Sequence, residues 1–323
     1  MKAVLIVRPS SLGDVVWALA VARDIARSRP GLAVDWVAEE AFAALPGLCA
    51  DVRRVLPIAL RRWRREPFAA RTWREMRSAR AAIRAERYDA IVDAQEQVKG
   101  AVIARAARGR RHGFDRRSIR EPVATWLHDT HHAVPRDVHF VVKCRRLAAA
   151  ALGYAIDGPP RWRWRLPAPP ACTPEEPFVV AVHATSRPDK RWPADRWHDL
   201  LAGADASGLR VVLPHGNDRE EEASRALAAG LARALVPPRL PLDTMAGLIA
   251  RAHAVVGVDT GLTHLAAALG TPTLALFTVT DTALAGVAVA GDHARDLGGN
   301  GDVPSVEAAR AALGALLRRA PGC

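Results

Sequence analysis

The sequence has little cysteine and no long apolar run. Its four cysteines are scattered and form no Cys-x-x-Cys pair, which favours reduced thiols in a cytoplasmic protein and argues against a zinc site (Cys49, Cys144, Cys172 and Cys323). The apolar run Ala3–Val7 stops at Arg8-Pro9 and is too short for a secretory signal. The longest weakly charged stretch, residues 254–280, is interrupted by polar and charged residues, so we expect no membrane span.

Lysine is also scarce, and the positive charge is distributed unevenly. Residues 1–170 contain 32 Lys and Arg against 17 Asp and Glu, whereas residues 171–323 contain 14 against 17, so the net charge of +12 comes from the first half. Much of it lies in residues 61–87, where Trp63, Phe68 and Trp73 are interleaved with arginines. Such a segment favours contact with nucleic acid, an anionic membrane or a polyanionic substrate; a solvated helix face is the alternative.

The alternation of apolar and helical segments indicates two α/β halves. At 323 residues and 50% hydrophobic content, the chain is long enough for two domains with separate cores. Strands are expected at residues 3–7, 33–38, 53–57 and 90–93, then at 178–183, 210–214, 254–258 and 273–277, with a last helix at 305–318. Seven prolines between residues 158 and 177 predict a semi-rigid linker. We therefore predict an N-terminal domain (1–158), a linker (159–177), a C-terminal domain (178–304) and a C-terminal helix and tail (305–323).

The most informative stretch is residues 254–277, AVVGVDTGLTHLAAALGTPTLALF. A buried strand ends there on an Asp-Thr-Gly turn that opens into a small-residue helix, whose N-terminal amides and dipole favour a phosphate. The backbone N–H groups of Gly261, Leu262 and Thr263 are expected to be free, and the Asp259 carboxylate suits a hydroxyl-bearing group. A simple turn with an N-cap is the alternative interpretation.

A second unit of the same kind begins the chain. Residues 3–28 predict a strand, a Ser-Ser-Leu-Gly-Asp loop and a helix with one apolar face. Asp14 lies at the start of that helix, where it can act as a general base on a hydroxyl or simply cap the helix. Each half thus offers a loop at the carboxyl end of a strand, where open α/β sheets bind ligands.

The chain resembles the bacterial lipopolysaccharide heptosyltransferases, the ADP-heptose transferase family among the GT-B glycosyltransferases. The resemblance rests on an ordered set of motifs: Ser10-Ser11-Leu12-Gly13-Asp14, residues 58–64, Asp93-Ala94-Gln95 through Lys99, His112-Gly113, Arg120-Glu121-Pro122, residues 183–186, Lys190-Arg191-Trp192-Pro193, and residues 258–264. It implies two Rossmann-like parallel-sheet domains that face each other across a cleft. It also implies inverting transfer of L-glycero-D-manno-heptose from ADP-heptose to a Kdo hydroxyl of Kdo-lipid A.

The same resemblance assigns roles to individual residues. Asp14 is the catalytic base. The donor ligands are Thr185, Ser186 and Lys190 for the phosphates, Glu220 for the ribose, and Asp259, Thr260, Gly261 and His264 around the sugar diphosphate. The acceptor ligands are Ser10, Arg61, Arg62, Arg64, Lys99 and Arg120, since arginine suits bidentate capture of carboxylate and phosphate. No Asp-x-Asp clamp follows a strand, which suits a transferase that uses no metal and no cofactor.

The chain departs from the family pattern at three places. Glu96 stands where the family commonly has glycine, and Lys143 stands where arginine is expected. Residues 278–282 lack the usual Gly-Pro before Thr-Asp and carry Val279 instead. These departures concern the predicted acceptor site and the edge of the predicted donor site.

Other functions are open at this point. A different ADP-heptose-dependent core transferase would share these motifs. A nicotinamide-dependent oxidoreductase is disfavoured because the first loop has only Gly13 where Gly-x-Gly-x-x-Gly is needed. A basic protein that binds nucleic acid or a membrane would explain residues 61–87 but not the second half, and no nucleic-acid-binding signature accompanies the charge. The resemblance implies a peripheral enzyme at the anionic cytoplasmic face of the inner membrane and no nucleic-acid partner.

Overall fold

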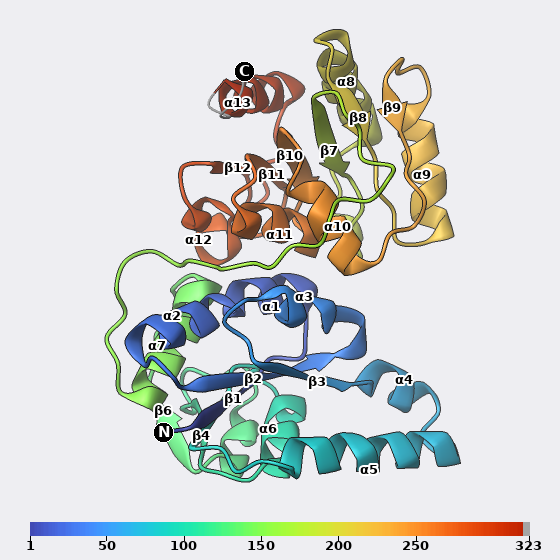
Figure 1. Cartoon of the computed structure of the whole chain (residues 1–323). Coiled ribbons are helices and arrows are strands. Elements are labelled where there is room, and N and C mark those ends of the chain that lie inside the picture. The colour runs from blue at the N-terminus through green and yellow to red at the C-terminus, as the bar shows by residue number, and fades with distance from the viewer. Residues whose placement is uncertain (319–323) are drawn as a thin grey trace. The chain divides into compact units, whose positions relative to one another are not determined.

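The computed structural model describes residues 1–318, which form two compact units, Met1–Arg165 and a second unit that begins at Leu166 (Figure 1). The predicted linker, residues 159–177, spans this boundary. Its first part pairs with the first unit, where the N–H of Ala50 donates to the carbonyl of Arg163 at 2.7 Å. No helix within residues 1–318 is long and apolar enough to cross a bilayer.

The first unit contains a six-stranded parallel sheet in the order β3-β2-β1-β4-β5-β6. Its strands are β1 (Ala3–Val7), β2 (Ala33–Glu39), β3 (Arg54–Ile58), β4 (Ala90–Asp93), β5 (Arg111–Phe114) and β6 (Thr130–His132). Its helices are α1 (Leu12–Ala18), α2 (Ala20–Ser28), α3 (Ala44–Leu48), α4 (Leu60–Arg65), α5 (Ala70–Arg84), α6 (Val98–Ala106) and α7 (Phe140–Leu152), with short 3-10 turns η1 (Glu40–Phe42) and η2 (Pro122–Leu127).

The second unit repeats this strand order, β12-β11-β10-β7-β8-β9, again with parallel pairing. Its strands are β7 (Phe178–Val182), β8 (Arg210–Val212), β9 (Ala234–Leu235), β10 (Ala254–Val258), β11 (Thr273–Phe277) and β12 (Ala294–Gly298). Its helices are α8 (Ala194–Ala206), α9 (Asp218–Ala228), α10 (Leu242–Ile249), α11 (Gly261–Leu269), α12 (Thr282–Ala285) and α13 (Val306–Leu317), with 3-10 turns η3 (Pro188–Lys190) and η4 (Ala288–Ala290).

Both sheets are covered on their two faces, which explains their continuous apolar strands. In the first unit α1, α2 and α7 pack on one face and α5 and α6 on the other (Figure 1). All five residues of β1, β7, β10 and β11 are buried, as expected for parallel strands with helices on both sides. The predicted α/β class with two parallel sheets is therefore confirmed.

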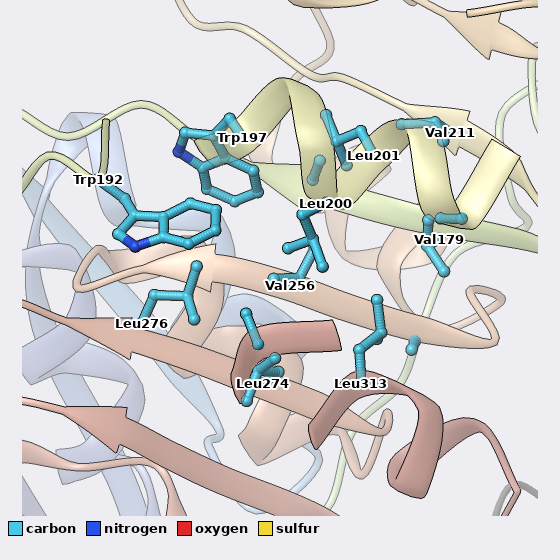
Figure 2. Close-up of a cluster of buried hydrophobic side chains, with 14 of the residues drawn as sticks. Val179, Trp192, Trp197, Leu200, Leu201, Val211, Val256, Leu274, Leu276 and Leu313 are labelled. Atoms are coloured by element: carbon cyan, nitrogen blue, oxygen red, sulfur yellow. The ribbon is translucent and has the colours of Figure 1, made fainter. Parts of the chain in front are cut away.

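One core of the second unit lies between its sheet and the helices α8 and α13. Figure 2 shows Trp192, Trp197, Leu200 and Leu313 in this cluster. The two tryptophan rings meet edge to face at 5.3 Å, and the indole N–H of Trp192 donates to the carbonyl of Pro304 at 2.9 Å. The loop before α13 is thus attached to the core, and the N-cap of α13 is Ser305, whose side chain accepts from the N–H of Ala308.

Four strands are absent from the sequence-based prediction: β5, β6, β9 and β12. They contain two to five residues, and β5, β6 and β12 carry polar or glycine residues, as in Arg-His-Gly-Phe and Thr-His-His. All four lie at or next to a sheet edge, where burial no longer demands a continuous apolar run.

Candidate functional site

The strand order fixes where ligands can bind in each unit. In both sheets the order reverses at the centre, between β1 and β4 in the first and between β7 and β10 in the second. Loops on either side of such a reversal diverge and leave a crevice at the carboxyl ends of the strands. The predicted site residues that follow these four strands are therefore brought to the two crevices.

Asp14 is held at the crevice of the first sheet by three groups. It occupies the third position of α1, and its carboxylate accepts from the backbone N–H of Ser11 at 2.9 Å and from the Ser11 hydroxyl at 2.8 Å. The Arg8 guanidinium completes the set at 2.7 Å. Asp14 thus has the hydrogen bond of a helix cap, and it also retains about a third of its side-chain exposure.

The Asp14 carboxyl is ionised at neutral pH. Burial opposes its charge, but the Arg8 guanidinium and the Ser11 donors outweigh that penalty, so its pKa lies below the ordinary value of an aspartate. An ionised carboxylate can accept a proton, as a general base requires.

Arg8 is a site residue that the sequence analysis missed. It is buried at the end of β1, donates to the carbonyl of Ala94 at 2.5 Å, and lies 4.5 Å from the centre of the Phe140 ring. It thereby connects the loop after β1 with the loop after β4. The available signal was a single arginine that ends a fully apolar strand, because a charge at that position requires a partner.

The loop after β4 joins the same crevice. Lys99 on α6 donates to the Ser10 hydroxyl at 3.0 Å, and the Gln95 side chain accepts from the Ser10 N–H at 3.3 Å. Burial and the neighbouring charges of Arg8, Arg64 and Arg61 lower the pKa of Lys99. The structure therefore gathers Ser10, Lys99, Arg61 and Arg64 near Asp14.

A buried pair supports this loop from below. His128 Nε2 and Asp93 Oδ2 are 2.9 Å apart with both side chains fully buried, and the other Asp93 oxygen accepts from the Gln95 N–H at 2.9 Å. A Cβ atom at Gly113 would lie 2.3 Å from the His128 ring, so only glycine fits there. This explains Gly113 of the His112-Gly113 motif without assigning it a catalytic role.

The predicted acceptor arginines differ in their surroundings. The Arg61 and Arg64 side chains are exposed, and Arg120 is exposed in the loop before η2. Arg62 instead bridges Glu40 at 2.9 Å and Glu75 at 2.6 Å. The hydrogen bonds that Arg62 donates to those carboxylates raise its pKa. The Arg62 guanidinium is therefore already paired with two carboxylates of the same chain, whereas the prediction assigned it to the acceptor.

Glu96 and Lys143, two of the departures from the family pattern, are in direct contact. Glu96 has a φ of +63°, in the left-handed region that favours glycine, and its carboxylate forms an ion pair with the Lys143 ammonium. The departure at Val279 lies beside Thr278 and Thr280, which donate to the Asp189 carbonyl at 2.6 Å and to Asp259 at 2.5 Å.

Asp259 is the centre of the second crevice. Its carboxylate is 2.6 Å from the Lys190 ammonium, 3.3 Å from His264 Nε2 and 2.5 Å from the Thr280 hydroxyl. Burial opposes the charge, but His264, Lys190 and Thr280 outweigh it, so the pKa of Asp259 is well below its ordinary value. The side chain therefore takes part in a network across four elements and does not cap α11.

The start of α11 has fewer open amides than predicted. The N–H of Thr263 donates to the carbonyl of Thr260 at 3.1 Å, and the Thr263 hydroxyl donates to the carbonyl of Val258 at 2.7 Å, so Thr263 is not a free donor. Gly261 and Leu262 occupy the first two helical positions, whose N–H groups have no partner inside a helix. Thr260 is the N-cap residue, but its side chain makes no capping hydrogen bond.

The remaining predicted donor residues lie on the same edge of the sheet. The Thr185 hydroxyl points to the carbonyl of Asp259 at 3.4 Å, whereas Ser186 is exposed in the loop after β7. Glu220, in the first turn of α9, accepts from the N–H of Gly216 at 2.8 Å. It is also close enough to raise the pKa of His183 against the burial that lowers it. Within the described residues, no group of three or more His, Cys, Asp or Glu could hold a metal ion.

Two parallel sheets of identical strand order, each with polar loops at its central reversal, are the architecture of the GT-B glycosyltransferases. Residues 76–295 match the model of glycosyltransferase family 9 (heptosyltransferase). The chain is 40% identical to lipopolysaccharide heptosyltransferase 1 of Escherichia coli strain K12 over 88% of this chain and 90% of that protein. The solved structures of E. coli heptosyltransferase WaaC with ADP and with ADP-2-deoxy-2-fluoro heptose superpose with TM-scores of 0.87 and 0.86, at 35% identity and over 97% of this chain and 99% of theirs.

The chain therefore belongs to glycosyltransferase family 9, the heptosyltransferases. The predicted enzyme class and the predicted GT-B fold are both confirmed.

The Asp259 network predicts a specific dependence of stability on pH. Because the folded pKa is lowered, the contribution of this carboxylate is fully present above the unfolded pKa of about 3.9 and is lost as the pH falls through the folded pKa. We expect Asp259→Asn to lower the melting temperature near neutral pH. Between about pH 4 and pH 2 the melting temperature of this variant should then fall less than that of the wild type.

Thermal melts of both proteins across this pH range measure the effect. Asp189→Asn is the matched control. It removes a carboxylate that lies next to Lys190 in the sequence and forms an exposed ion pair with Arg187. An Asp259→Asn melting curve parallel to that of the wild type at every pH would contradict the assignment.

Proposed function

We propose that this chain is a heptosyltransferase I, which transfers L-glycero-D-manno-heptose from ADP-heptose to a Kdo hydroxyl of Kdo-lipid A with inversion at the anomeric carbon. The observation that carries the proposal is the Lys190–Asp259–His264 network at the central reversal of the second sheet. The relatives at 40% identity are named lipopolysaccharide heptosyltransferase 1. The structure of heptosyltransferase II is only 22% identical, so that alternative is not favoured.

The donor is proposed to bind by an exchange of partners. Lys190 neutralises Asp259 in the free protein, and a diphosphate offers the same ammonium a second set of anionic oxygens. Once Lys190 turns toward the phosphates, Asp259 gains an oxygen that can accept from sugar hydroxyls while Thr280 and His264 keep it oriented. We assign Thr185, Ser186 and the first amides of α11 to the phosphates, and Glu220 to the ribose.

Asp14 is proposed as the base that takes the proton from the acceptor hydroxyl as this oxygen attacks the anomeric carbon and ADP departs. Its lowered pKa keeps it ionised, and Arg8 and Ser11 fix the position of its oxygens. A general base of this kind contributes about 10² to 10⁴ to the rate.

The acceptor is proposed to bind through Ser10, Lys99, Arg61, Arg64 and Arg120. Burial and then the charges of Arg8, Arg64 and Arg61 lower the pKa of Lys99, and carboxylates or phosphates of Kdo-lipid A would offset that repulsion between cations. We propose a supporting role for Arg62, because Glu40 and Glu75 already occupy its guanidinium.

We further propose that the enzyme works at the anionic cytoplasmic face of the inner membrane. Phe68, Trp73 and Met76 are exposed at 94%, 51% and 39%, next to exposed arginines of α5 (Arg74, Arg77, Arg80 and Arg84). Aromatic and basic side chains together favour an anionic lipid surface. We call these seven residues the α5 face.

Product analysis with ADP-heptose and Kdo-lipid A tests the central proposal. One heptose should be added to Kdo, with release of ADP and an inverted anomeric linkage. Transfer only to an acceptor that already carries heptose would point instead to another core transferase.

Replacing Asp14 should separate catalysis from helix capping. We expect Asp14→Asn to lower kcat by about 10²- to 10⁴-fold and to leave the Kd for ADP nearly unchanged, since the general base is lost and the donor ligands lie in the second unit. Ser11→Ala is the control, because it removes a hydrogen bond to the same carboxylate but keeps the carboxylate. Activity of Asp14→Asn within a few fold of that of Ser11→Ala would leave Asp14 with capping alone.

The arginines of α4 should differ in their effect on the acceptor. We expect the double variant Arg61→Ala, Arg64→Ala to raise the KM for Kdo-lipid A about tenfold, to flatten its salt dependence and to leave the KM for ADP-heptose unchanged. Arg62→Ala should instead lower the melting temperature with little change in either KM, since it breaks the bridge between Glu40 and Glu75. Equal effects of the three arginines on the acceptor KM would contradict this division.

Membrane attachment should depend on the aromatic part of the α5 face. We expect sedimentation with vesicles of anionic lipid and none with zwitterionic vesicles. The double variant Phe68→Ser, Trp73→Ser should weaken vesicle binding about tenfold or more, because it removes two exposed apolar side chains. Trp126→Ser, which changes a tryptophan on η2 that is 78% exposed against 51% for Trp73, is the control. Equal binding by all three proteins would exclude the α5 face.

A further inference from the structure

The loop between β4 and α6 contains an unusual backbone conformation at Glu96. Glu96 and Asn300 are the two non-glycine residues with positive φ among residues 1–318. A side chain at such a position costs conformational energy, which surrounding contacts must offset. The Glu96 side chain is nearly buried, with 12% of its surface exposed, so it does not extend into solvent.

Lys143 supplies the offsetting contact. It lies on α7, also nearly buried, and its ammonium pairs with the Glu96 carboxylate. The same ammonium donates to the carbonyl of Ser118 at 2.9 Å and lies 4.9 Å from the centre of the Phe114 ring. Its charge is therefore satisfied inside the first unit.

The pair joins two loops that lead to proposed acceptor cations. Glu96 lies in the loop before α6, the helix that carries Lys99, and Ser118 precedes Arg120 in the loop before η2. We call these the Lys99 loop and the Arg120 loop. The two loops are also tied by backbone groups: the N–H of Glu121 donates to the carbonyl of Glu96 at 3.1 Å, and the Glu121 carboxylate accepts from the N–H of Val98 at 2.8 Å. Lys143 closes this arrangement from α7.

We propose that Glu96 and Lys143 are positioning residues for the acceptor, whose buried ion pair holds the Lys99 loop and the Arg120 loop at a fixed separation. Lys143 does not bind the acceptor in this arrangement, because Glu96 occupies it. The two departures from the family pattern thus depend on each other. Glu96 stands where a glycine is common, and Lys143 neutralises the Glu96 carboxylate, which would otherwise repel an anionic acceptor. The inference rests on the proposed function, since its readout is the acceptor KM.

A double-mutant cycle tests the pair. Lys143→Met leaves a buried carboxylate without its cation and should raise the acceptor KM about tenfold, with kcat and the ADP-heptose KM within about twofold of wild type. Glu96→Gln removes the charge at unchanged size and backbone and should raise the acceptor KM less, by about threefold. The double variant Glu96→Gln, Lys143→Met removes both charges together and should return the acceptor KM to within about threefold of wild type.

The controls separate this proposal from its rivals. Arg27→Met breaks an ion pair with Asp157 elsewhere in the first unit and should leave the acceptor KM unchanged. If Lys143 binds the acceptor directly, Lys143→Met and the double variant will have equally raised KM values, which overturns the proposal. If Lys143→Met does not fold, the double variant still decides: a KM within about threefold of wild type supports the coupled pair, whereas a KM raised about tenfold means that Lys143 itself binds the acceptor and overturns the proposal. If the wild-type protein transfers no heptose, the proposed function is wrong. If the wild type is active but the effects of the two single substitutions on the acceptor KM simply add in the double variant, only the coupling of Glu96 with Lys143 is wrong.

Discussion

Parallel strand pairing is the constraint on which the rest of this structure depends. It requires a crossover between consecutive strands, so every loop that follows a strand reaches the same edge of its sheet. The central reversal of strand order then separates two loops and leaves room for a ligand. In each unit one of these two connections carries the carboxylate that the resemblance singles out. It is Asp14 in the first turn of α1, after β1, and Asp259 directly after β10. The same geometry built twice can therefore serve two different substrates.

At both edges a carboxylate is kept ionised by hydrogen bonds and basic side chains, which outweigh the effect of burial. Arg8 pairs with Asp14, and Lys190 pairs with Asp259. The partners differ in burial and in contacts: Arg8 is buried, donates to a second group and lies against Phe140, whereas Lys190 is one-fifth exposed at the end of η3. A fixed guanidinium preserves the position of a base, and a movable ammonium can exchange one anion for another. The two ion pairs thus suit the two roles proposed for them, proton removal and release of a diphosphate.

Much of the fold could be predicted from the sequence, because fully covered parallel strands need continuous apolar runs. Strands β1, β4, β10 and β11 have the predicted bounds, whereas β6, Thr-His-His at a sheet edge, has no apolar signal. Asp14, Lys190 and Asp259 could be found because they follow such strands. The ion pairs of Arg62 could not be predicted, because its partners Glu40 and Glu75 belong to η1 and α5. Nor could the Glu96–Lys143 pair, whose members are 47 residues apart and meet only through tertiary packing.

The rarity of lysine gives its positions meaning. Of the four lysines, Lys99, Lys143 and Lys190 lie at or beneath the carboxyl edges of the two sheets, although arginine supplies nearly all the positive charge elsewhere. An arginine fork is best where two oxygens are bound in one plane, as at Arg62 and Arg8. An ammonium on a flexible stem is better where a single donor must reach a hydroxyl, close a tight turn or change partners, as Lys99, Lys143 and Lys190 do or are proposed to do. At these three of its four lysines, a chain that otherwise uses arginine therefore has a smaller and more adaptable cation.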